Sequence, residues 1–595
     1  MTILQSPLTT ATAVFSAWLE RFGTALEGGD TAGAGNCFVA DGYWRDILAF
    51  TWSYRTFAGP AGIAQALGNV LADVQPHSFR VSPDRLAPRR MRRSAREVVE
   101  GYFDFETKLG RGAGFVRLVL NETTPEDSKA WLFLTTMQEL RGHEEAVGDH
   151  RPTGVEHSTN FAGPNWLDQR IESSKFSDRD RPVLIVGGGQ SGLALGARLR
   201  AFGVDALIVE KNDRIGDNWR NRYHSLTLHN EVWANGLPYM PFPPTWPTFL
   251  PKDKLAGWLE GYAEAMELNV WTGTELIGAA FDQEAQTWTV QLKQSDGAQR
   301  ELRVRHVVLA TGGVSGVPNL PSLPGLDIFD GEVIHSGGFG SGIPYQGKRA
   351  IVIGTGNSGH DVAQDLHDNG AADVTIVQRS PTCVVSLVPS GTMVYAVYSE
   401  GPAEDIDLIT AAIPYPVLQE TYQWLTKKTC SLDRDLLDRL EAVGFEIDMG
   451  PDDTGFHMKY LRQGGGYYIN VGCSDLIAEG KVHLLHARDI AEFTPGGLRL
   501  ADGRIIASDL VVLATGYENL QEGIRRIFGS DVADKVGPVW GFDSDGFLKN
   551  MWTRTPQPSF WIMGGALMEC RLWSRFLALQ IKADLEGIAT TPCLN

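Results

Sequence analysis

Two glycine-rich stretches of the sequence have the composition and spacing of loops that hold a phosphate group. Their glycines are Gly187, Gly189 and Gly192 in GGGQSG, and Gly354, Gly356 and Gly359 in GTGNSG. In such a GxGxxG turn the first glycine permits the tight turn, the second lets the backbone approach a pyrophosphate, and the third lets a helix pack on a strand. The start of that helix then faces the phosphates with its free N–H groups.

Each loop stands between a strand and a helix, which is the context that this chemistry needs. The apolar segments VLIV and AIVI precede the loops, and a helical segment and a second apolar strand follow each of them. Apolar runs of this kind are typical of parallel strands that are buried on both faces. The sequence therefore predicts two dinucleotide-binding units, with an ordinary glycine-rich turn between strand and helix as the alternative.

The residues that end the second strand of each unit indicate which ribose the unit binds. Glu210 ends this strand in the first unit, and a carboxylate there accepts hydrogen bonds from a ribose hydroxyl pair. Gln378 and Arg379 stand at the corresponding place in the second unit, where a neutral residue followed by arginine suits a 2′-phosphate. We therefore expect FAD in the first unit and NADPH in the second. The alternative for Arg379 is a solvated charge on a loop.

His335 lies in FDGEVIHSGGF (329–339), between glycines and at a spacing that fits neither a helix face nor a strand face. Two apolar strands that break at Ala-Thr-Gly flank this part of the chain, with Thr311 and Thr515 in the turns. A strand that leaves one domain for another needs such a glycine turn. We therefore expect the second unit to be inserted into the first. His335 is then expected at the junction, where it couples the positions of the two units in preference to transferring a proton.

The composition indicates a globular protein and excludes several kinds of partner. The chain has 595 residues, a net charge of −19 and a pI of about 5.2, so its surface repels nucleic acid and anionic membranes. No two of the six cysteines form CxxC, which argues against a dithiol redox pair and a zinc ribbon, and we expect no metal. The absence of a signal peptide and of any apolar run of about 18 residues predicts a cytoplasmic protein.

The pattern of elements predicts an α/β fold with a separate unit at its N-terminus. Residues 12–27 have the apolar spacing of a helix, and alternating segments at 98–109, 114–123 and 129–142 predict an antiparallel sheet. This small α+β unit precedes two Rossmann-type domains. The predicted boundaries are 1–150 for the α+β domain, 151–180 for a polar linker, 181–345 and 509–595 for the two parts of the FAD domain, and 346–508 for the NADP domain with a helical insert at 383–465.

The order of the motifs resembles that of the class B flavoprotein monooxygenases over roughly residues 180–595. The first glycine loop is followed by GDNW, Ala-Thr-Gly, FDGEVIHSGGF, the second glycine loop and a second Ala-Thr-Gly. The histidine motif and INVGCSDLIAEGKVHLL (469–485) are most similar to flavin-containing monooxygenases of the YUCCA-like branch. Baeyer–Villiger monooxygenases carry tryptophan where this chain has Phe339, and GDNW departs from the GGxW of the family.

The resemblance implies FAD and NADPH as cofactors and a monooxygenase reaction with O2. NADPH gives hydride to FAD, reduced FAD forms a C4a-(hydro)peroxyflavin, and one oxygen atom passes to a small soft nucleophile such as an amine, a sulfide or an indole-type aromatic compound. The first alternative is Baeyer–Villiger or decarboxylating oxygenation of a carbonyl substrate. The second, of another class, is a flavin-binding protein with uncoupled NADPH oxidase activity or a regulatory role.

The resemblance also assigns roles to single residues. Asn230 is implied as the hydrogen-bond donor beside the flavin, with His229 at the flavin edge and Trp219 packed on the cofactor. The alternatives are an asparagine that caps a turn and a tryptophan of the core. The other cofactor-binding candidates are Gly187, Gly189, Ser191, Gly192, Glu210, Lys211 and Thr311 for FAD, and Gly354, Gly356, Asn357, Ser358, Gly359, Arg379 and Thr515 for NADPH.

Further segments have predicted roles around this site. The insert 383–465 is expected to form a substrate lid, and its aromatic residues either line a pocket or belong to the core: Tyr395, Tyr398, Tyr415, Tyr422 and Trp424. The C-terminal helix after FWIMGG either faces the flavin with its N-terminus or is an ordinary closing helix. FVADGYWRDILAF and YRTFAGPAGI resemble the NTF2-like (SnoaL-like) domain, which suggests a non-catalytic module and a homodimer.

Overall fold

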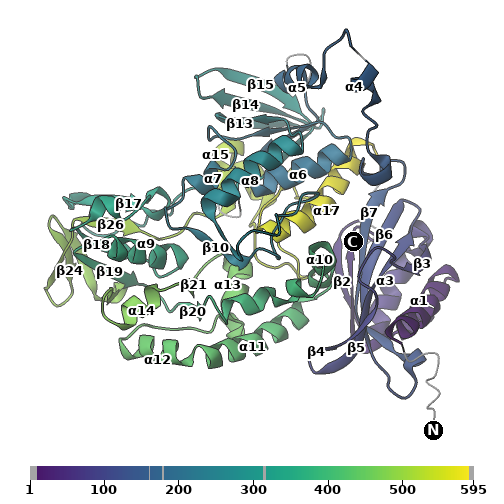
Figure 1. Ribbon diagram of the computed structural model, residues 1–595, viewed down its shortest axis with the longest axis horizontal. Helices are drawn as coiled ribbons and strands as arrows, with labels where there is room; N and C mark the ends of the chain where they lie inside the picture. Colours follow the sequence, from purple (N-terminus) through teal and green to yellow (C-terminus); the bar gives the residue numbers. More distant parts are fainter. Residues whose placement is uncertain (1–9, 160, 177–179, 313–315, 589–595) are drawn as a thin grey trace.

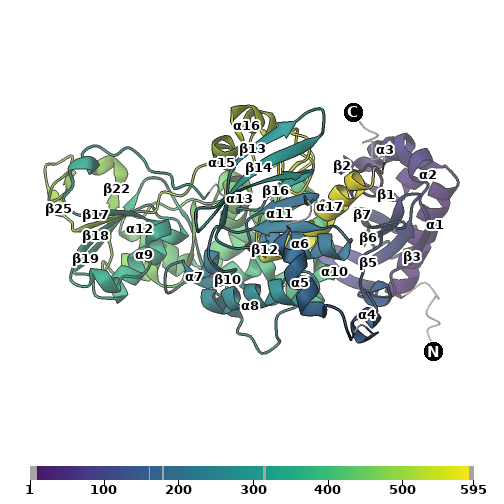
Figure 2. The ribbon, with the colours of Figure 1, turned by 90° about the horizontal axis from the view of Figure 1, so that it is seen from above.

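The computed structural model describes residues 10–159, 161–176, 180–312 and 316–588, which are arranged around an N-terminal sheet and two parallel sheets. Figure 1 shows the N-terminal region on the right, one parallel sheet with its helices in the centre, and the second parallel sheet on the left. Figure 2 shows the same order from above. None of the helices in the described part of the chain is long and apolar enough to cross a membrane.

The central sheet is parallel and carries the first glycine loop at the end of β8. Its strand order is β12 (Val270–Trp271), β9 (Ala206–Val209), β8 (Val183–Val186), β16 (His306–Leu309) and β27 (Phe560–Ile562). Every residue of β8 and β16 is buried, as expected for strands that are covered on both faces. The helix α6 (Gln190–Ala201) packs on β8 and β9, and α8 (Lys252–Ala265) and α17 (Leu567–Leu585) pack against α6. A separate antiparallel sheet contains β13 (Thr274–Asp282), β14 (Thr287–Gln294) and β15 (Gln299–Val304).

The second parallel sheet carries the second glycine loop at the end of β18. Its strand order is β17 (Glu332–His335), β26 (Leu510–Leu513), β18 (Arg349–Ile353), β19 (Asp373–Gln378) and β22 (His483–His486). The helix α9 (Asn357–Asp368) packs on β18 and β19. In sequence, all strands of this sheet lie between β16 and β27 of the central sheet. The chain therefore leaves the central sheet after β16 and returns to it after β26.

The N-terminal region is a seven-stranded sheet packed against α1 (Ala11–Glu27), α2 (Thr31–Asn36) and α3 (Gly59–Val74). Its strands are β1 (Phe38–Ile47), β2 (Tyr54–Ala58), β3 (His77–Val81), β4 (Arg89–Arg93), β5 (Arg96–Glu106), β6 (Gly110–Val119) and β7 (Lys129–Leu140). The predicted antiparallel pairing of the last three strands is confirmed. Aromatic rings fill the space between sheet and helices, and Phe103 stacks on Phe133 at 5.3 Å. A Cβ at Gly114 would stand 2.1 Å from the Phe103 ring, so this glycine makes room for it.

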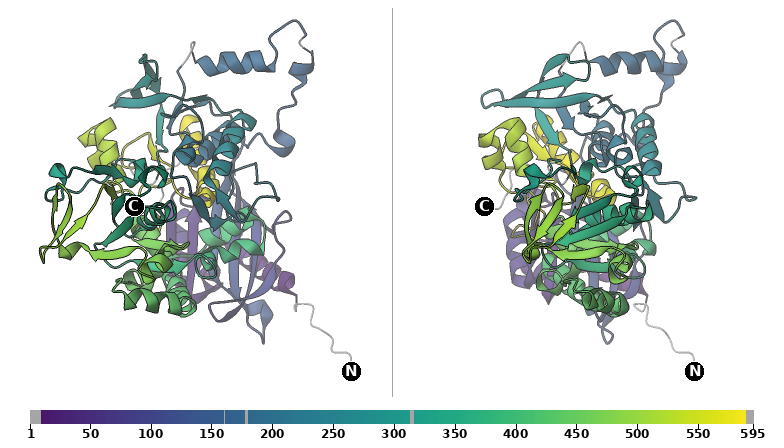
Figure 3. Two further views of the ribbon diagram at one scale, coloured as in Figure 1. Left: turned by 60° about the vertical axis from the view of Figure 1, so that its left-hand side comes forward. Right: turned by 90° about the vertical axis from the view of Figure 1, so that its left-hand side faces the viewer.

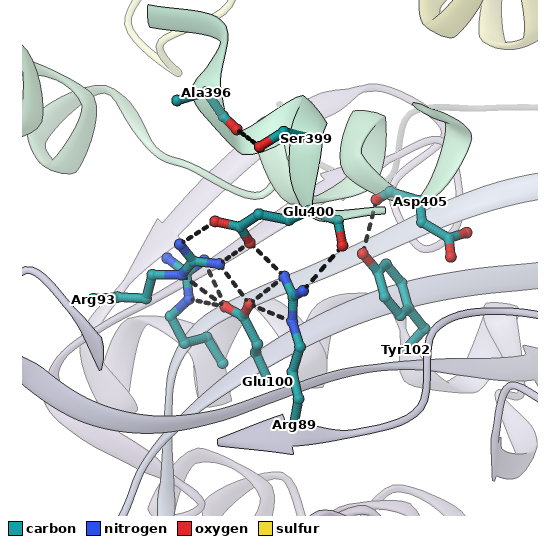
Figure 4. Close-up of polar contacts among 9 residues, drawn as sticks. Arg89, Arg93, Glu100, Tyr102, Ala396, Ser399, Glu400 and Asp405 are labelled. Atoms are coloured by element: carbon teal, nitrogen blue, oxygen red, sulfur yellow. Dashed lines mark hydrogen bonds and ion pairs between the residues drawn. The ribbon is translucent and has the colours of Figure 1, made fainter. Parts of the chain in front are cut away.

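Ion pairs join the N-terminal sheet to the helical insert (Figure 4). Arg89 and Arg93 of β4 each bind two carboxylates, Glu100 of β5 and Glu400 at the end of η6 (Gly391–Glu400). Tyr102 of β5 also donates its hydroxyl proton to a carbonyl of α10 (Ala403–Ala411) at 3.0 Å. The insert is thus fastened to the N-terminal sheet through η6 and α10.

The insert is helical, as predicted, but its first helical run is divided in two. α10 ends at Ala411 and α11 (Tyr415–Leu432) begins after Pro414, because proline has no backbone donor and cannot continue a helix. The helices α12 (Arg434–Ala442) and α13 (Gly455–Gln463) follow. The linker also contains helices, α4 (Val155–Thr159) and α5 (Trp166–Lys175), which stand at the edge of the molecule in Figure 3. A capping box at Asn165 stabilises the start of α5. The polar composition of this segment had predicted a linker without helices.

Candidate functional site

The first glycine loop has the backbone geometry of a dinucleotide site. Gly187 has a φ of 114°, and a Cβ at Gly192 would stand 2.0 Å from the Gly187 carbonyl oxygen. Glu210 accepts a hydrogen bond from the Gly188 N–H at 2.8 Å, which places its carboxylate beside the loop. α6 begins after Gly189 without a side-chain cap, so its first N–H groups are open to a phosphate. These residues fit FAD.

Two further elements lie against the first loop. Trp219 is half-buried and donates from Nε1 to the Gln190 amide oxygen at 3.3 Å, so it contacts the loop while it packs on the core. The Gln190 amide donates to the Gly565 carbonyl at 3.3 Å, and the Ser191 hydroxyl lies 3.3 Å from the Cys570 sulfur. The N-terminus of α17 therefore lies beside the loop.

The second glycine loop repeats this geometry. Gly354 has a φ of 118°, and a Cβ at Gly359 would stand 1.9 Å from the Gly354 carbonyl oxygen. α9 begins after Gly356, again without a side-chain cap, and Ser358 in its first turn is half-buried. Asn357 accepts a hydrogen bond from a backbone N–H of β21 (Tyr467–Asn470) at 2.9 Å, which fixes the loop. These residues fit a second dinucleotide.

Gln378 has a different role from the one its position suggested. Its side chain is buried and bonds the Glu446 backbone twice, donating to the carbonyl at 2.8 Å and accepting from the N–H at 2.9 Å. It therefore fixes the segment after α12 and is not available to a nucleotide. Arg379 is exposed directly after β19, where a phosphate can reach it.

His335 ends β17, beside the segment through which the chain returns from the second sheet, and both of its ring nitrogens have backbone partners. Nδ1 accepts a hydrogen bond from the Gly337 N–H at 3.0 Å, so Nε2 carries the proton and donates it to the Gly516 carbonyl at 3.0 Å. The ring packs against Tyr517 with 5.1 Å between centroids, and partial burial lowers its pKa. His335 therefore joins the end of β17 to the returning chain, and neither nitrogen is left to exchange a proton with a ligand.

Asn230 lies on β10 (Thr227–Glu231), which packs against η6, the element that carries Tyr395. Because Asn230 is inside a strand, the alternative of a turn cap does not apply. Just before β10, the His224 N–H donates to the Gly340 carbonyl at 2.7 Å. This bond connects the start of β10 to the segment between β17 and β18 of the second sheet. Burial lowers the pKa of the neighbouring His229 to about 4, so its imidazole is neutral at pH 7.

Aromatic residues of the insert gather around His457, and Tyr395 is one of them. The ring centroids of Tyr395, Tyr422 and Tyr460 lie 5.8, 5.1 and 5.7 Å from that of His457. The Tyr460 hydroxyl donates to Glu569 of α17 at 2.8 Å. Tyr395 and Tyr422 were predicted from the sequence, whereas His457, Tyr460 and Glu569 were not. The one signal for Glu569 was its place in the first turn of the C-terminal helix.

Three other aromatic residues of the insert make contacts outside this cluster. Tyr398 is buried and donates to Asp407 at 2.8 Å. Tyr415 packs on Phe542 with 4.7 Å between ring centroids. Trp424 points to solvent, with 62% of its surface exposed. They therefore do not line the space around Asn230.

Three further residues that were predicted to bind cofactors are Lys211, Thr311 and Thr515. Lys211 and Thr311 are exposed near the first loop. Thr515 donates to the Asn319 carbonyl at 2.5 Å, which ties together the two segments that connect the sheets. Thr515 is thus held by the backbone of the other connection.

Comparisons with known proteins agree with the geometry of the two loops. Residues 184–389 match the family described as pyridine nucleotide-disulphide oxidoreductase. The chain is 32% identical to a probable indole-3-pyruvate monooxygenase, YUCCA9 of Arabidopsis thaliana, over 65% of this chain and 84% of that protein. It is also 32% identical to indole-3-pyruvate monooxygenase YUCCA1 of Oryza sativa subsp. japonica, over 57% of this chain and 77% of that protein.

The fold is also similar to that in a solved structure, the complex of OTEMO with FAD and NADP. The TM-score is 0.50 at 19% identity, over 69% of this chain and 85% of that one. Together with the paired glycine loops, this similarity identifies a dinucleotide-binding α/β fold. The chain belongs to the family of flavin-dependent monooxygenases that includes the YUCCA proteins.

Proposed function

We propose that the first glycine loop holds FAD, that the second holds NADPH, and that the enzyme inserts one oxygen atom into a small soft nucleophile: an amine, a sulfide or an indole-type aromatic compound. FAD and NADPH are the cofactors of this monooxygenase. The observation that supports the proposal best is the pair of uncapped helix N-termini, each reached through a loop in which a Cβ at Gly192 or Gly359 would collide with backbone.

The side chains of this enzyme would bind, orient and shield the cofactors. Glu210 would hold the ribose of FAD, and Arg379 would hold the 2′-phosphate of NADPH. Asn230, held on β10, would donate a hydrogen bond at the reacting edge of the flavin. The neutral His229 adds no charge there, and the rings of the insert keep water away. Bound FAD, once reduced by NADPH, supplies the chemistry that activates O2.

The names of the relatives favour a second candidate function. Both relatives are named for indole-3-pyruvate, which is a carbonyl compound with a carboxylate. Decarboxylating or Baeyer–Villiger oxygenation of a carbonyl substrate is therefore the alternative. An uncoupled NADPH oxidase or a regulatory flavoprotein is the remaining possibility of another class.

We propose the following domain arrangement for this function. Residues 1–150 form an NTF2-like domain, residues 151–180 a linker, and residues 346–508 an NADP domain inserted between the two parts of an FAD domain, 181–345 and 509–595. The topology of the two parallel sheets supports the insertion. Because the N-terminal sheet contacts the insert, a homodimer would use a different surface.

The proposal is tested by following NADPH, oxygen and product in one experiment. The FAD-loaded enzyme is mixed with NADPH without air, and we expect loss of the yellow flavin colour. Air is then admitted with methyl phenyl sulfide, an indole or a cyclic ketone as probes. A sulfoxide or hydroxylated indole supports the first candidate, and a lactone supports the alternative. Stoichiometric hydrogen peroxide without product from any probe would contradict both.

Arg379→Ala is expected to weaken the use of NADPH while leaving the use of NADH unchanged. A charge-assisted bond to a phosphate contributes about 1.5–3 kcal/mol, so KM for NADPH should rise about tenfold or more. Steady-state kinetics with both nucleotides measure the ratio. Arg488→Ala is the matched control, because Arg488 is an exposed arginine that pairs with Glu446 at 2.7 Å. An equal change for NADPH and NADH would show that Arg379 does not bind the 2′-phosphate.

Asn230→Leu is expected to keep FAD bound and reducible but to divert oxygen to hydrogen peroxide. Loss of one positioned donor at a reacting centre costs about 10²–10³ in rate, so the fraction of NADPH that yields product should fall about tenfold or more. Peroxide and product are quantified against NADPH consumed. Asn221→Leu, at an exposed asparagine, is the control. Unchanged coupling in the Asn230 variant would refute the proposed role.

A further inference from the structure

Glu569 is the third residue of α17, and both of its hydrogen bonds go to one carboxylate oxygen. Oε2 accepts from the Ala566 N–H at 2.7 Å and from the Tyr460 hydroxyl at 2.8 Å. The first of these bonds satisfies the backbone N–H of the residue that precedes the helix. Oε1 has no donor among the residues that the structure describes, and the side chain is only half-buried. One oxygen of this carboxylate is therefore open to a ligand.

Arginines neutralise several buried carboxylates of this chain, whereas no ion pair is formed by Glu569 in the described part of the chain. Ion pairs join Glu100 to Arg117 at 2.8 Å, Glu145 to Arg198 at 3.2 Å, and Asp407 to Arg571 at 2.8 Å. Asp46 lacks a cation but has hydrogen-bond donors on both oxygens. Glu569 has only neutral donors on one oxygen, and burial raises its pKa. Because this partly buried carboxylate has no positively charged partner, a bound cation would stabilise it.

Aromatic rings provide the surroundings that a cation prefers. The pKa values of Tyr395, Tyr422 and Tyr467 are raised first by burial, and the Glu569 carboxylate raises each of them further. His457 lies among these rings, and burial lowers its pKa to about 4, so it does not supply the missing positive charge. The faces of tyrosine rings attract ammonium groups. The carboxylate and several rings thus belong to one cluster.

We propose that Glu569 and the rings of Tyr395, Tyr422 and Tyr460 form the substrate subsite and select an aromatic substrate that carries a protonated amine. The inference rests on the proposed function, because η6, which carries Tyr395, packs against β10, which carries Asn230 at the expected place of oxygen transfer. The ammonium group donates to Oε1 and lies against the ring faces, whereas a carboxylate is repelled. The protonated nitrogen has no lone pair, so the oxygen atom goes to a ring carbon or a sulfur of the substrate.

Two probes with the same indole ring test the subsite: tryptamine, which carries an ammonium group, and indole-3-propionate, which carries a carboxylate. Their dissociation constants are measured by calorimetry with the FAD-loaded enzyme in the presence of NADP⁺. We expect tryptamine to bind about tenfold or more tightly, and Glu569→Gln to remove this preference. Glutamine keeps the capping acceptor and the Tyr460 bond but has no charge. Glu586→Gln, at the far end of α17 where Lys582 pairs with Glu586 at 2.6 Å, should change neither constant.

Tighter binding of indole-3-propionate by the wild-type enzyme, or binding of neither probe, overturns the inference whether or not the variant folds. A Glu569→Gln variant that retains the preference for tryptamine overturns it as well. Anaerobic reduction of the flavin by NADPH in the same preparation reports on the proposed function. Failure of that reduction contradicts the assignment of the two loops, whereas normal reduction without a preference for tryptamine contradicts the subsite alone.

Discussion

A Gly359→Ala variant is expected to keep its flavin but to lose NADPH-driven reduction of that flavin almost completely. The new Cβ would stand 1.9 Å from the Gly354 carbonyl oxygen, which belongs to backbone and cannot turn aside. α9 would have to move away from β18, and its first N–H groups would leave the place of the phosphates. A displacement of about 1 Å at such a site costs about 10²-fold in rate. Anaerobic rapid mixing with NADPH measures the reduction, and absorbance measures the flavin content.

Two matched variants show whether this loss belongs to the second loop. Gly338→Ala adds the same methyl group where nothing lies within 4 Å, so it should leave reduction unchanged. Gly192→Ala places a Cβ 2.0 Å from the Gly187 carbonyl oxygen and should release the flavin instead. If Gly359→Ala lost its flavin and Gly192→Ala kept it, the two loops would have exchanged assignments.

The elements around both loops could be predicted because their signals are local. β8 covers the four residues of VLIV, and α6 begins three residues after Gly187, as the spacing of the glycines requires. Glu210 directly follows the short apolar strand β9, so its place in the fold has the same local signal. The apolar runs and the positions of the glycines are therefore sufficient to predict the strands and helices of these two units.

The partners of buried polar residues could not be predicted, because distant segments supply them. Gln378 bonds the backbone of Glu446, and that contact depends on how α12 folds back on the sheet. The bond between Tyr460 and Glu569 joins residues 109 positions apart. No periodicity in the sequence encodes either contact. The candidate site is therefore visible in outline from its glycine loops, while the groups that face the substrate emerge only from the tertiary packing.

Glu100→Gln is expected to loosen the contact between the N-terminal sheet and the insert. The Glu100 carboxylate is 1% exposed and pairs with Arg117 at 2.8 Å and with Arg89 and Arg93 at 2.9 Å. Removing one charge from a buried ion cluster costs about 3–5 kcal/mol, because the arginines would then face one another without it. Hydrogen exchange of residues 391–400 and unfolding in urea measure the loss. Glu97→Gln on the same strand, 44% exposed and paired with Arg90 at 3.3 Å, should cost at most about 1 kcal/mol.

The same cluster predicts how acid affects this contact. Burial alone would raise the pKa of Glu100, but Arg117 and the neighbouring arginines together lower it to about 2. The folded pKa lies below the unfolded value of about 4.3, so the stabilisation is complete above pH 4.3 and is lost as the pH falls towards 2. The difference in free energy of unfolding between wild type and Glu100→Gln should therefore shrink over that interval.

Since Tyr395 and Glu400 share η6, the Glu100→Gln variant should also release more hydrogen peroxide per NADPH at neutral pH. Equal peroxide yields from the Glu97 and Glu100 variants would mean that the N-terminal sheet does not position the insert.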